Sequence, residues 1–228
     1  MISFLKSLKR SFITIYRQYI HNCDTSQYDK RVIQLGCPLS VNPRLIQLDD
    51  YTRIQDDVKI ISHNLPVKIK KYTAIASGCL IIPGTHTPTV GIPQFLSIAH
   101  INDSGTGITI NEDCWIGAEC VLLNKCEIGR GAVVGARSVV TKPVPPYAVV
   151  AGSPAKIIAV KFTIGQVLEH EKIIYPPNER MSERELKELY DKYYTGLRPI
   201  GTSDISDIDI VKLNNSRKEF GIKDYSKL

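Results

Sequence analysis

Branched aliphatic residues recur at every sixth position over much of this chain. In the longest uninterrupted run, residues 110–145, six hexapeptides follow one another in one frame. Each begins with an aliphatic residue: Ile110, Ile116, Leu122, Ile128, Val134 and Val140. A period of six fits neither a helix, which repeats every 3.6 residues, nor an ordinary strand, which repeats every two. It is typical of a solenoid in which each turn of chain stacks on the previous one. We therefore expect the first position of each hexapeptide to point into the core.

The same frame is found upstream of the long run. Three hexapeptides begin at Leu48, Ile54 and Ile60, and after a three-residue slip around residues 64–66 three more begin at Ile69, Ile75 and Ile81. A longer break, residues 87–107, then separates these from the run at Ile110. Loops of this length without secondary structure of their own are uncommon unless they are functional. The break therefore predicts a loop that leaves the coils.

The fifth positions of the first five hexapeptides of the long run are small, and four of the six cysteines of the chain occupy fifth positions: Cys79, Cys114, Cys120 and Cys126. A small side chain at a fixed place in every repeat is expected at a tight corner. There is no CxxC pair, which argues against a zinc site. We interpret these cysteines as buried, reduced and structural, which points to the cytoplasm.

Three segments carry a family resemblance: WIG at Trp115–Gly117, GARSVVTKPVPP at Gly135–Pro146 and AGSPAK at Ala151–Lys156. In this order, and on top of the hexapeptides, they resemble the C-terminal half of the left-handed β-helix acyltransferases. The sugar O-acetyltransferase and xenobiotic acetyltransferase branches are the most similar. The resemblance covers about residues 40–180. It implies a mainly β fold, a left-handed parallel β-helix of about four coils with three short strands each, a homotrimer, and acetyl-CoA as the acetyl donor.

The ends of the chain lack the repeat, so we expect three parts: an N-terminal amphipathic helical segment (1–30), the β-helix domain with its protruding loop (31–160), and a helical C-terminal extension and tail (161–228). Residues 2–20 form a basic amphipathic pattern. Such a helix either packs on the end of the solenoid or rests on anionic lipid at the inner face of the membrane. Helices are also predicted for residues 162–174 and, from a capping box at Ser182 and Glu185, through about Tyr194.

The apolar runs and the charge of the chain limit the kinds of partner that we expect. No run of eighteen apolar residues is present, and the N-terminus lacks a small-residue cleavage site, so we expect neither a membrane span nor a signal peptide. The net charge is +6, but the basic residues are scattered and form no nucleic-acid-binding motif. Attraction to anions is the general expectation, and the phosphates of CoA or an acidic glycan would both satisfy it.

The resemblance assigns the catalytic base to His86, which stands in PGTHTPTVG where the hexapeptides end and the loop begins. Histidine is suited to this role because its ordinary pKa lies near neutrality. Two other histidines, His100 in the loop and His63, are candidates for contacts with the acceptor. Phe95 could stack on a sugar face. Both histidines also have an ordinary structural interpretation as loop or surface residues.

On the donor side, the resemblance assigns the oxyanion contact to the backbone N–H of Ala118. The predicted CoA-binding positions are Trp115, Gly117, Gly135, Ala136, Ser138, Thr141, Lys142 and Lys156. Trp115 would pack against substrate or pantetheine, and the glycines would leave room for the pantetheine arm. The implied mechanism is direct transfer, in which the base deprotonates a hydroxyl that attacks the thioester. It requires no metal and no acyl-enzyme.

The favoured acceptor is a hydroxyl of a cell-surface glycan, of capsular or lipopolysaccharide type, or of its sugar precursor. An amino-sugar N-acetyltransferase and a xenobiotic acetyltransferase use the same base and donor, and both stay open. A non-catalytic hexapeptide scaffold needs neither His86 nor AGSPAK. The γ-class carbonic anhydrases need three histidines on adjacent coils, and the spacing of His63, His86 and His100 fits that pattern poorly.

Overall fold

The computed structural model describes residues 33–35, 43–62 and 64–222. The strands are β1 (Ile33–Leu35), β2 (Ile46–Leu48), β3 (Arg53–Ile54), β4 (Lys59–Ile60), β5 (Val67–Ile69), β6 (Ala74–Ile75), β7 (Leu80–Ile82), β8 (Ile108–Ile110), β9 (Trp115–Ile116), β10 (Val121–Leu123), β11 (Glu127–Ile128), β12 (Val133–Val134), β13 (Val139–Val140), β14 (Ala148–Ala151) and β15 (Lys156–Val160). The helices are η3 (Pro43–Leu45), η4 (Gln94–Ala99), α2 (Ile164–Ile174), η5 (Pro177–Glu179), α3 (Glu183–Tyr193) and α4 (Asp207–Glu219). The helix predicted for residues 2–20, and His63, lie outside the described residues.

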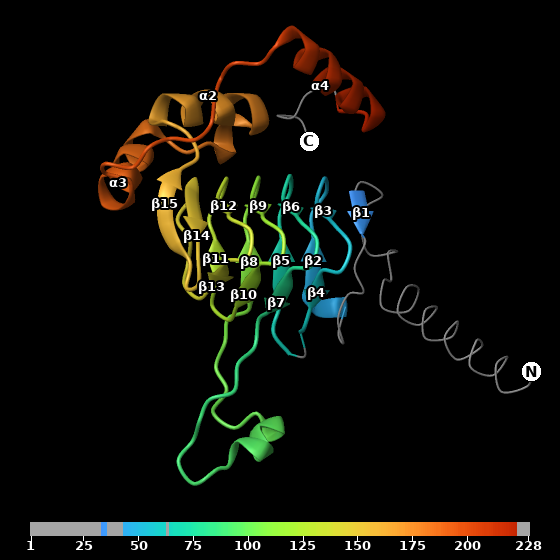
Figure 1. The fold of residues 1–228 in the computed structure, drawn as a ribbon, viewed down its shortest axis with the longest axis vertical. Coiled ribbons are helices and arrows are strands. Elements are labelled where there is room, and N and C mark those ends of the chain that lie inside the picture. Colours follow the sequence, from blue (N-terminus) through green and yellow to red (C-terminus); the bar gives the residue numbers. More distant parts are fainter. Residues whose placement is uncertain (1–32, 36–42, 63, 223–228) are drawn as a thin grey trace, which may run out of the picture. The chain divides into compact units, whose positions relative to one another are not determined.

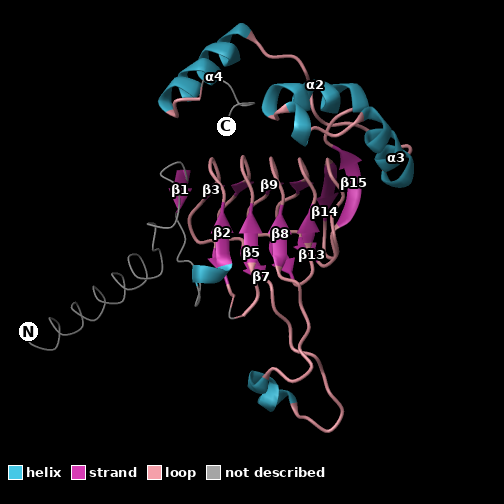
Figure 2. Cartoon of the chain, turned by 180° about the vertical axis from the view of Figure 1, so that it is seen from behind, coloured by secondary structure: helices cyan, strands magenta, loops and turns pink. Residues whose placement is uncertain are grey.

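The strands form three sheets that together make a solenoid (Figures 1 and 2). The sheet orders are β1-β3-β6-β9-β12-β14-β15, β13-β10-β7-β4 and β11-β8-β5-β2. Each coil contributes one strand to each sheet, and the pairs are parallel, as between β5 and β8 or β7 and β10. Three strands per turn give four full coils, β2–β4, β5–β7, β8–β10 and β11–β13, which is the number expected from twelve hexapeptides.

The core consists of stacked aliphatic columns. The first positions of the hexapeptides fall opposite one another on neighbouring strands, as in Ile75 against Ile116 and Ile81 against Leu122. Eleven of the twelve are at most 1% exposed; Leu48, in the first coil, is half-buried. The prediction that these positions point inward is therefore confirmed for the stacked coils. Burial of these columns is the main stabilising contribution that the repeat can make.

The corners explain why cysteine is used there. The Sγ of Cys79 donates to the carbonyl of Gly117 at 3.1 Å, and the Sγ of Cys120 donates to the carbonyl of Gly135 at 3.1 Å. Cys114 and Cys126 make the same contact to the next coil. A small side chain with a weak donor thus fills the corner and satisfies a buried carbonyl. All four thiols are buried and none forms a disulfide, as predicted.

The chain divides into two compact units, Met1–Ile158 and Ala159–Leu228. In the second unit, α2 and α3 begin with capping boxes at Thr163 and Ser182, which confirms both predicted helices. Helix α4 was not predicted. Among the described residues, no helix is both long enough and apolar enough to cross a membrane.

Candidate active site

A long loop leaves the coils after β7 and returns to them at β8 (Figure 1). It contains the short 3₁₀ helix η4, although no secondary structure was predicted for it. Its returning end is fixed to the coils. Asn124 Nδ2 donates to the carbonyl of Ser104 at 2.9 Å, and a Cβ on Gly105 would come within 2.5 Å of Leu65. The glycine therefore permits a close approach, and the loop has a defined base.

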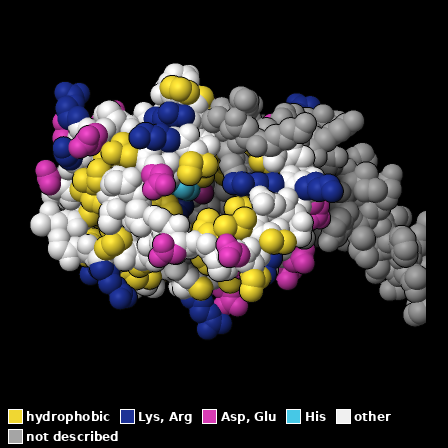
Figure 3. Space-filling view, turned by 90° about the horizontal axis from the view of Figure 1, so that it is seen from above, with side chains coloured by type: hydrophobic (Ala, Val, Ile, Leu, Met, Phe, Trp, Pro, Cys, Tyr) yellow, Lys and Arg dark blue, Asp and Glu magenta, His cyan; other side chains and the backbone are white. Residues whose placement is uncertain are grey.

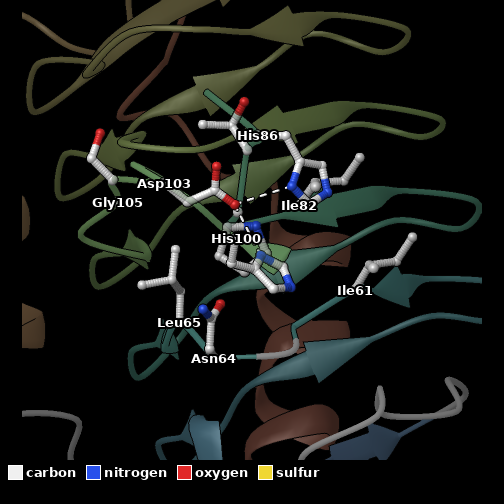
Figure 4. A pocket seen from close by; sticks show the side chains of 12 residues that line it. Ile61, Asn64, Leu65, Ile82, His86, His100, Asp103 and Gly105 are labelled. Atoms are coloured by element: carbon white, nitrogen blue, oxygen red, sulfur yellow. Dashed lines mark hydrogen bonds and ion pairs between the residues drawn. The ribbon is translucent and has the colours of Figure 1, made fainter. Parts of the chain in front are cut away.

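Two histidines bond to one carboxylate at the neck of this loop, the place where its outgoing and returning ends come together. The Nδ1 of His86 lies 3.0 Å from Oδ2 of Asp103, and the Nδ1 of His100 lies 2.9 Å from the same oxygen. The imidazole ring centroids are 5.1 Å apart. Figure 4 shows both rings turned toward the carboxylate. If the imidazoles are neutral, each donates its Nδ1–H to Asp103, so Nε2 of each ring is the proton acceptor.

The backbone holds the Asp103 carboxylate in place. Its other oxygen, Oδ1, accepts the amide N–H of Thr87 at 2.7 Å. That hydrogen bond is the largest cause that keeps the pKa of Asp103 below its ordinary value, and the bonds from His100 and His86 act in the same direction. The Asp103 side chain is only 13% exposed, whereas those of His86 and His100 are 47% and 42% exposed. An ionised carboxylate thus links the two ends of the loop, while both imidazoles stay accessible to solvent.

A pocket of about 280 Å³ opens beside these three residues. Its polar lining includes the two histidines and Asp103 (Figure 4). Its apolar lining consists of Ile61, Leu65, Ile82 and Pro83. No lysine or arginine is among the described residues that line it. The pocket therefore suits a small amphipathic molecule beside a histidine base.

The structure brings together only some of the predicted acceptor contacts. His86 and His100 both line the pocket. Phe95 lies on η4 and is 89% exposed, and it is absent from the residues lining the pocket. Sequence analysis missed Asp103, although its place three residues after His100 was an available signal for a paired side chain.

The predicted donor positions lie along the later coils. Trp115 begins β9 and is 60% exposed, and Ala136, Thr141, Lys142 and Lys156 are exposed. The buried Ser138 hydroxyl donates to the carbonyl of Gly135 at 2.6 Å and accepts the amide of Gly152 at 3.1 Å. The Ser138 side chain therefore stabilises the corner of the coil.

The glycines of this region have a structural reason for their presence. A Cβ on Gly117 would lie 2.6 Å from the backbone nitrogen of Ala136 and 2.8 Å from the carbonyl oxygen of Val134. A Cβ on Gly135 would lie 3.1 Å from that of Ala151. Close stacking of the coils thus requires Gly117 whether or not CoA passes it.

Charge is spread over the surface that Figure 3 shows. Lysine and arginine side chains on that face occur in separate groups, with acidic and apolar side chains between them. A continuous basic stripe, which nucleic-acid binding would favour, is not seen on that face.

Known proteins match part of this chain. Residues 107–142 match the family model "Bacterial transferase hexapeptide (six repeats)". A chloramphenicol acetyltransferase of Klebsiella aerogenes is 44% identical over 82 residues, which are 35% of this chain and 39% of that protein. A 2,3,4,5-tetrahydropyridine-2,6-dicarboxylate N-acetyltransferase of Staphylococcus aureus is 47% identical over 55 residues, 24% of this chain and 23% of that protein. The matched segments thus span less than half the length of these relatives.

Two solved structures are similar over about half the chain. A hexapeptide-repeat acetyltransferase of Vibrio cholerae is 27% identical, covers 54% of this chain and 66% of its own, and has a TM-score of 0.48. A maltose O-acetyltransferase of Clostridium difficile 630 is 24% identical, covers 55% and 66%, and has a TM-score of 0.47. The family match confirms the resemblance seen in the sequence over the stretch that it covers: residues 107–142 carry the hexapeptide repeat of the bacterial transferases.

Proposed function

We propose that the protein is an acetyl-CoA-dependent acetyltransferase with a left-handed β-helix, acting on a hydroxyl of a cell-surface glycan or its sugar precursor. The observation that carries this proposal is the placement of His86: it lines a pocket, and its Nδ1 is bonded to a carboxylate that the Thr87 amide holds. A histidine fixed in this way presents Nε2 to a substrate as a general base. The names of the relatives support acetyl transfer.

The mechanism follows from the chemistry of that nitrogen. Nε2 of His86 takes the proton of the acceptor hydroxyl as the oxygen attacks the thioester carbonyl of acetyl-CoA. The imidazolium that forms is stabilised by Asp103, which stays ionised. A backbone N–H stabilises the tetrahedral oxyanion, and we assign this role to Ala118. When the C–S bond breaks, the imidazolium returns its proton to the departing thiolate of CoA, so no acyl-enzyme forms.

The donor is proposed to lie between two copies of the chain in a homotrimer. Trp115, Gly117, Gly135, Ala136, Thr141, Lys142 and Lys156 are the residues proposed to bind it. Exposure of Lys142 and Lys156 is consistent with contact to CoA phosphates. Ser138 would support this surface through the corner that its hydroxyl stabilises.

A second candidate, acetylation of a xenobiotic alcohol, is favoured by two observations. The relative from Klebsiella aerogenes is named chloramphenicol acetyltransferase. In addition, the apolar residues that line the pocket, Ile61, Leu65 and Ile82 among them, suit an acceptor that is less polar than a sugar. Both candidates use the same base and the same donor.

The test is acceptor-dependent release of CoA thiol from acetyl-CoA, measured with polysaccharides, amino sugars and chloramphenicol-like alcohols. We expect release with one acceptor class, and a fall of about 10²- to 10⁴-fold for His86→Ala, the range that general acid–base catalysis contributes. His170→Ala, which changes a histidine of α2, is the matched control and should keep the native rate. Release that survives in His86→Ala would refute the assignment of the base, and no release with any acceptor would refute the proposed activity.

A further inference from the structure

The neck of the loop has a second chemical capability. The candidate ligand atoms of His86, His100 and Asp103 all lie within 4.8 Å of one another, and among the described residues this is the one group of three such side chains. We propose that it binds a divalent transition-metal ion, such as Zn²⁺, and that the ion inhibits the enzyme by occupying its base. The transfer itself needs no metal.

The donor set determines the class of metal. Two imidazole nitrogens and one carboxylate oxygen suit zinc, cobalt or ferrous iron, whereas magnesium and calcium prefer all-oxygen sites. The spacing is also suitable. Ligand atoms that each lie about 2.1 Å from a tetrahedral zinc ion are about 3.4 Å apart. The two N–O separations here are 3.0 and 2.9 Å, so the side chains need to move apart by about 0.5 Å to admit the ion.

The ligands are partly positioned in advance. The Thr87 amide holds Asp103, and His100 occupies the left-handed region at the end of η4, with φ 53° and ψ 37°. Its backbone N–H is bonded to the carbonyl of Ser97 at 2.9 Å. Because the two imidazoles remain almost half exposed, an ion could enter from solvent and keep water on its other positions.

The consequence for activity rests on the proposed function. A neutral imidazole that binds a metal through Nδ1 must carry its proton on Nε2. Binding would therefore move the His86 proton, through solvent, from Nδ1 to Nε2 with no net change in charge. The nitrogen that accepts the hydroxyl proton would then be a donor, so the metal-bound enzyme would lack its base.

The experiment uses the untagged full-length protein, stripped with a chelator that is then removed. Zinc binding is measured by equilibrium dialysis, and the ligand field is examined by visible absorption after Co²⁺ is added. We expect about one zinc per chain for the native protein and for His170→Ala, and loss of that zinc in His100→Ala and Asp103→Asn. Equal zinc in native and His100→Ala would overturn the proposal, as would a native protein that binds none.

Inhibition is measured separately as the ratio of acetyl-transfer rates with and without zinc for each variant. We expect the rate with zinc, divided by the metal-free rate of the same protein, to be well below one for the native protein and much closer to one for His100→Ala. An equal reduction in both would overturn the inhibitory role. Stoichiometric zinc in a protein without acetyl transfer would support the metal site and reject the proposed function. Acetyl transfer without zinc binding would support the proposed function and reject the metal site.

Discussion

Asp103 is the residue on which the candidate site depends most. Its two carboxylate oxygens bond three partners: Thr87, His86 and His100. His86 could be selected from the sequence because it stands where the hexapeptides end. The pairing of Asp103 with His86 could not, because the two residues are 17 positions apart and the sequence between them gives no indication that the loop closes on itself. A contact made by loop closure has no periodic signal, unlike a contact between stacked coils.

Asp103→Asn should lower the catalytic efficiency without removing the base. The single amide oxygen of asparagine could still accept from Nδ1 of His86, but the Thr87 amide would then lose its acceptor, and the negative charge that stabilises the imidazolium would be lost. A hydrogen bond to a charged group contributes roughly 1.5–3 kcal/mol, so we expect kcat/KM to fall about 10- to 100-fold, mostly in kcat. Steady-state kinetics would measure this. Asp56→Asn, on an exposed turn of the coils, is the control, and a fall confined to KM would contradict the proposed role.

The sequence predicted the elements that carry a repeating pattern or a capping box, and missed the helix that carries neither. The coils follow from the hexapeptides, and α3 follows from the capping box at Ser182. Helix α4 was missed because its apolar residues do not fall on one face: Ile208, Ile210 and Val211 are all exposed. Its start still carries a signal, since the Ser206 hydroxyl accepts the amide of Asp209. Capping chemistry therefore identifies this helix where hydrophobic patterning does not.

Helix α3 should make the second unit sensitive to alkaline pH. Tyr190 donates its hydroxyl proton to the carbonyl of Phe162 at 2.5 Å, and burial raises its pKa to about 12. In the unfolded chain a tyrosine has a pKa of about 10. This pKa difference makes its full contribution to the free energy of unfolding below a pH of about 10. The contribution is lost as the pH rises toward 12, because the unfolded chain releases the proton first. Burial also raises the pKa of Tyr194.

Denaturant unfolding, followed by circular dichroism at pH 8 and at pH 11, would measure this loss. Tyr190→Phe should be less stable at pH 8, since the carbonyl of Phe162 loses its donor, but should show a smaller loss between the two values. Tyr193→Phe, whose residue is 39% exposed, is the control and should keep the native difference. An unchanged difference in Tyr190→Phe would show that this phenol is not the titrating group.

At the scale of the whole molecule, the described chain leaves an apolar row uncovered on its seven-stranded sheet. Trp115 is in register with Ala74 on one side and Val133 on the other, and it is 60% exposed. A large aromatic side chain on a sheet surface is stabilised when a partner covers it. The frame of the repeat accounts for the row, because each of its members comes directly before a first position: Ile75, Ile116 and Val134. The sequence of one chain does not give the partner that would cover it.

Because Trp115 is the one tryptophan of the chain, its fluorescence reports directly on this surface. If the protein is a homotrimer that covers the row, native emission should be blue-shifted from that of a solvent-exposed indole. The emission should shift to the red on dilution, at the concentration where light scattering shows that the trimer dissociates. If the donor site adjoins Trp115, CoA should also change the emission of the trimer. Phe95→Ala, which removes an aromatic residue from the loop, is the control and should keep the native emission. A monomer by light scattering would reject the trimer. A trimer whose emission is that of exposed indole would place the interface elsewhere, and would leave the row on β6, β9 and β12 without the partner proposed for it.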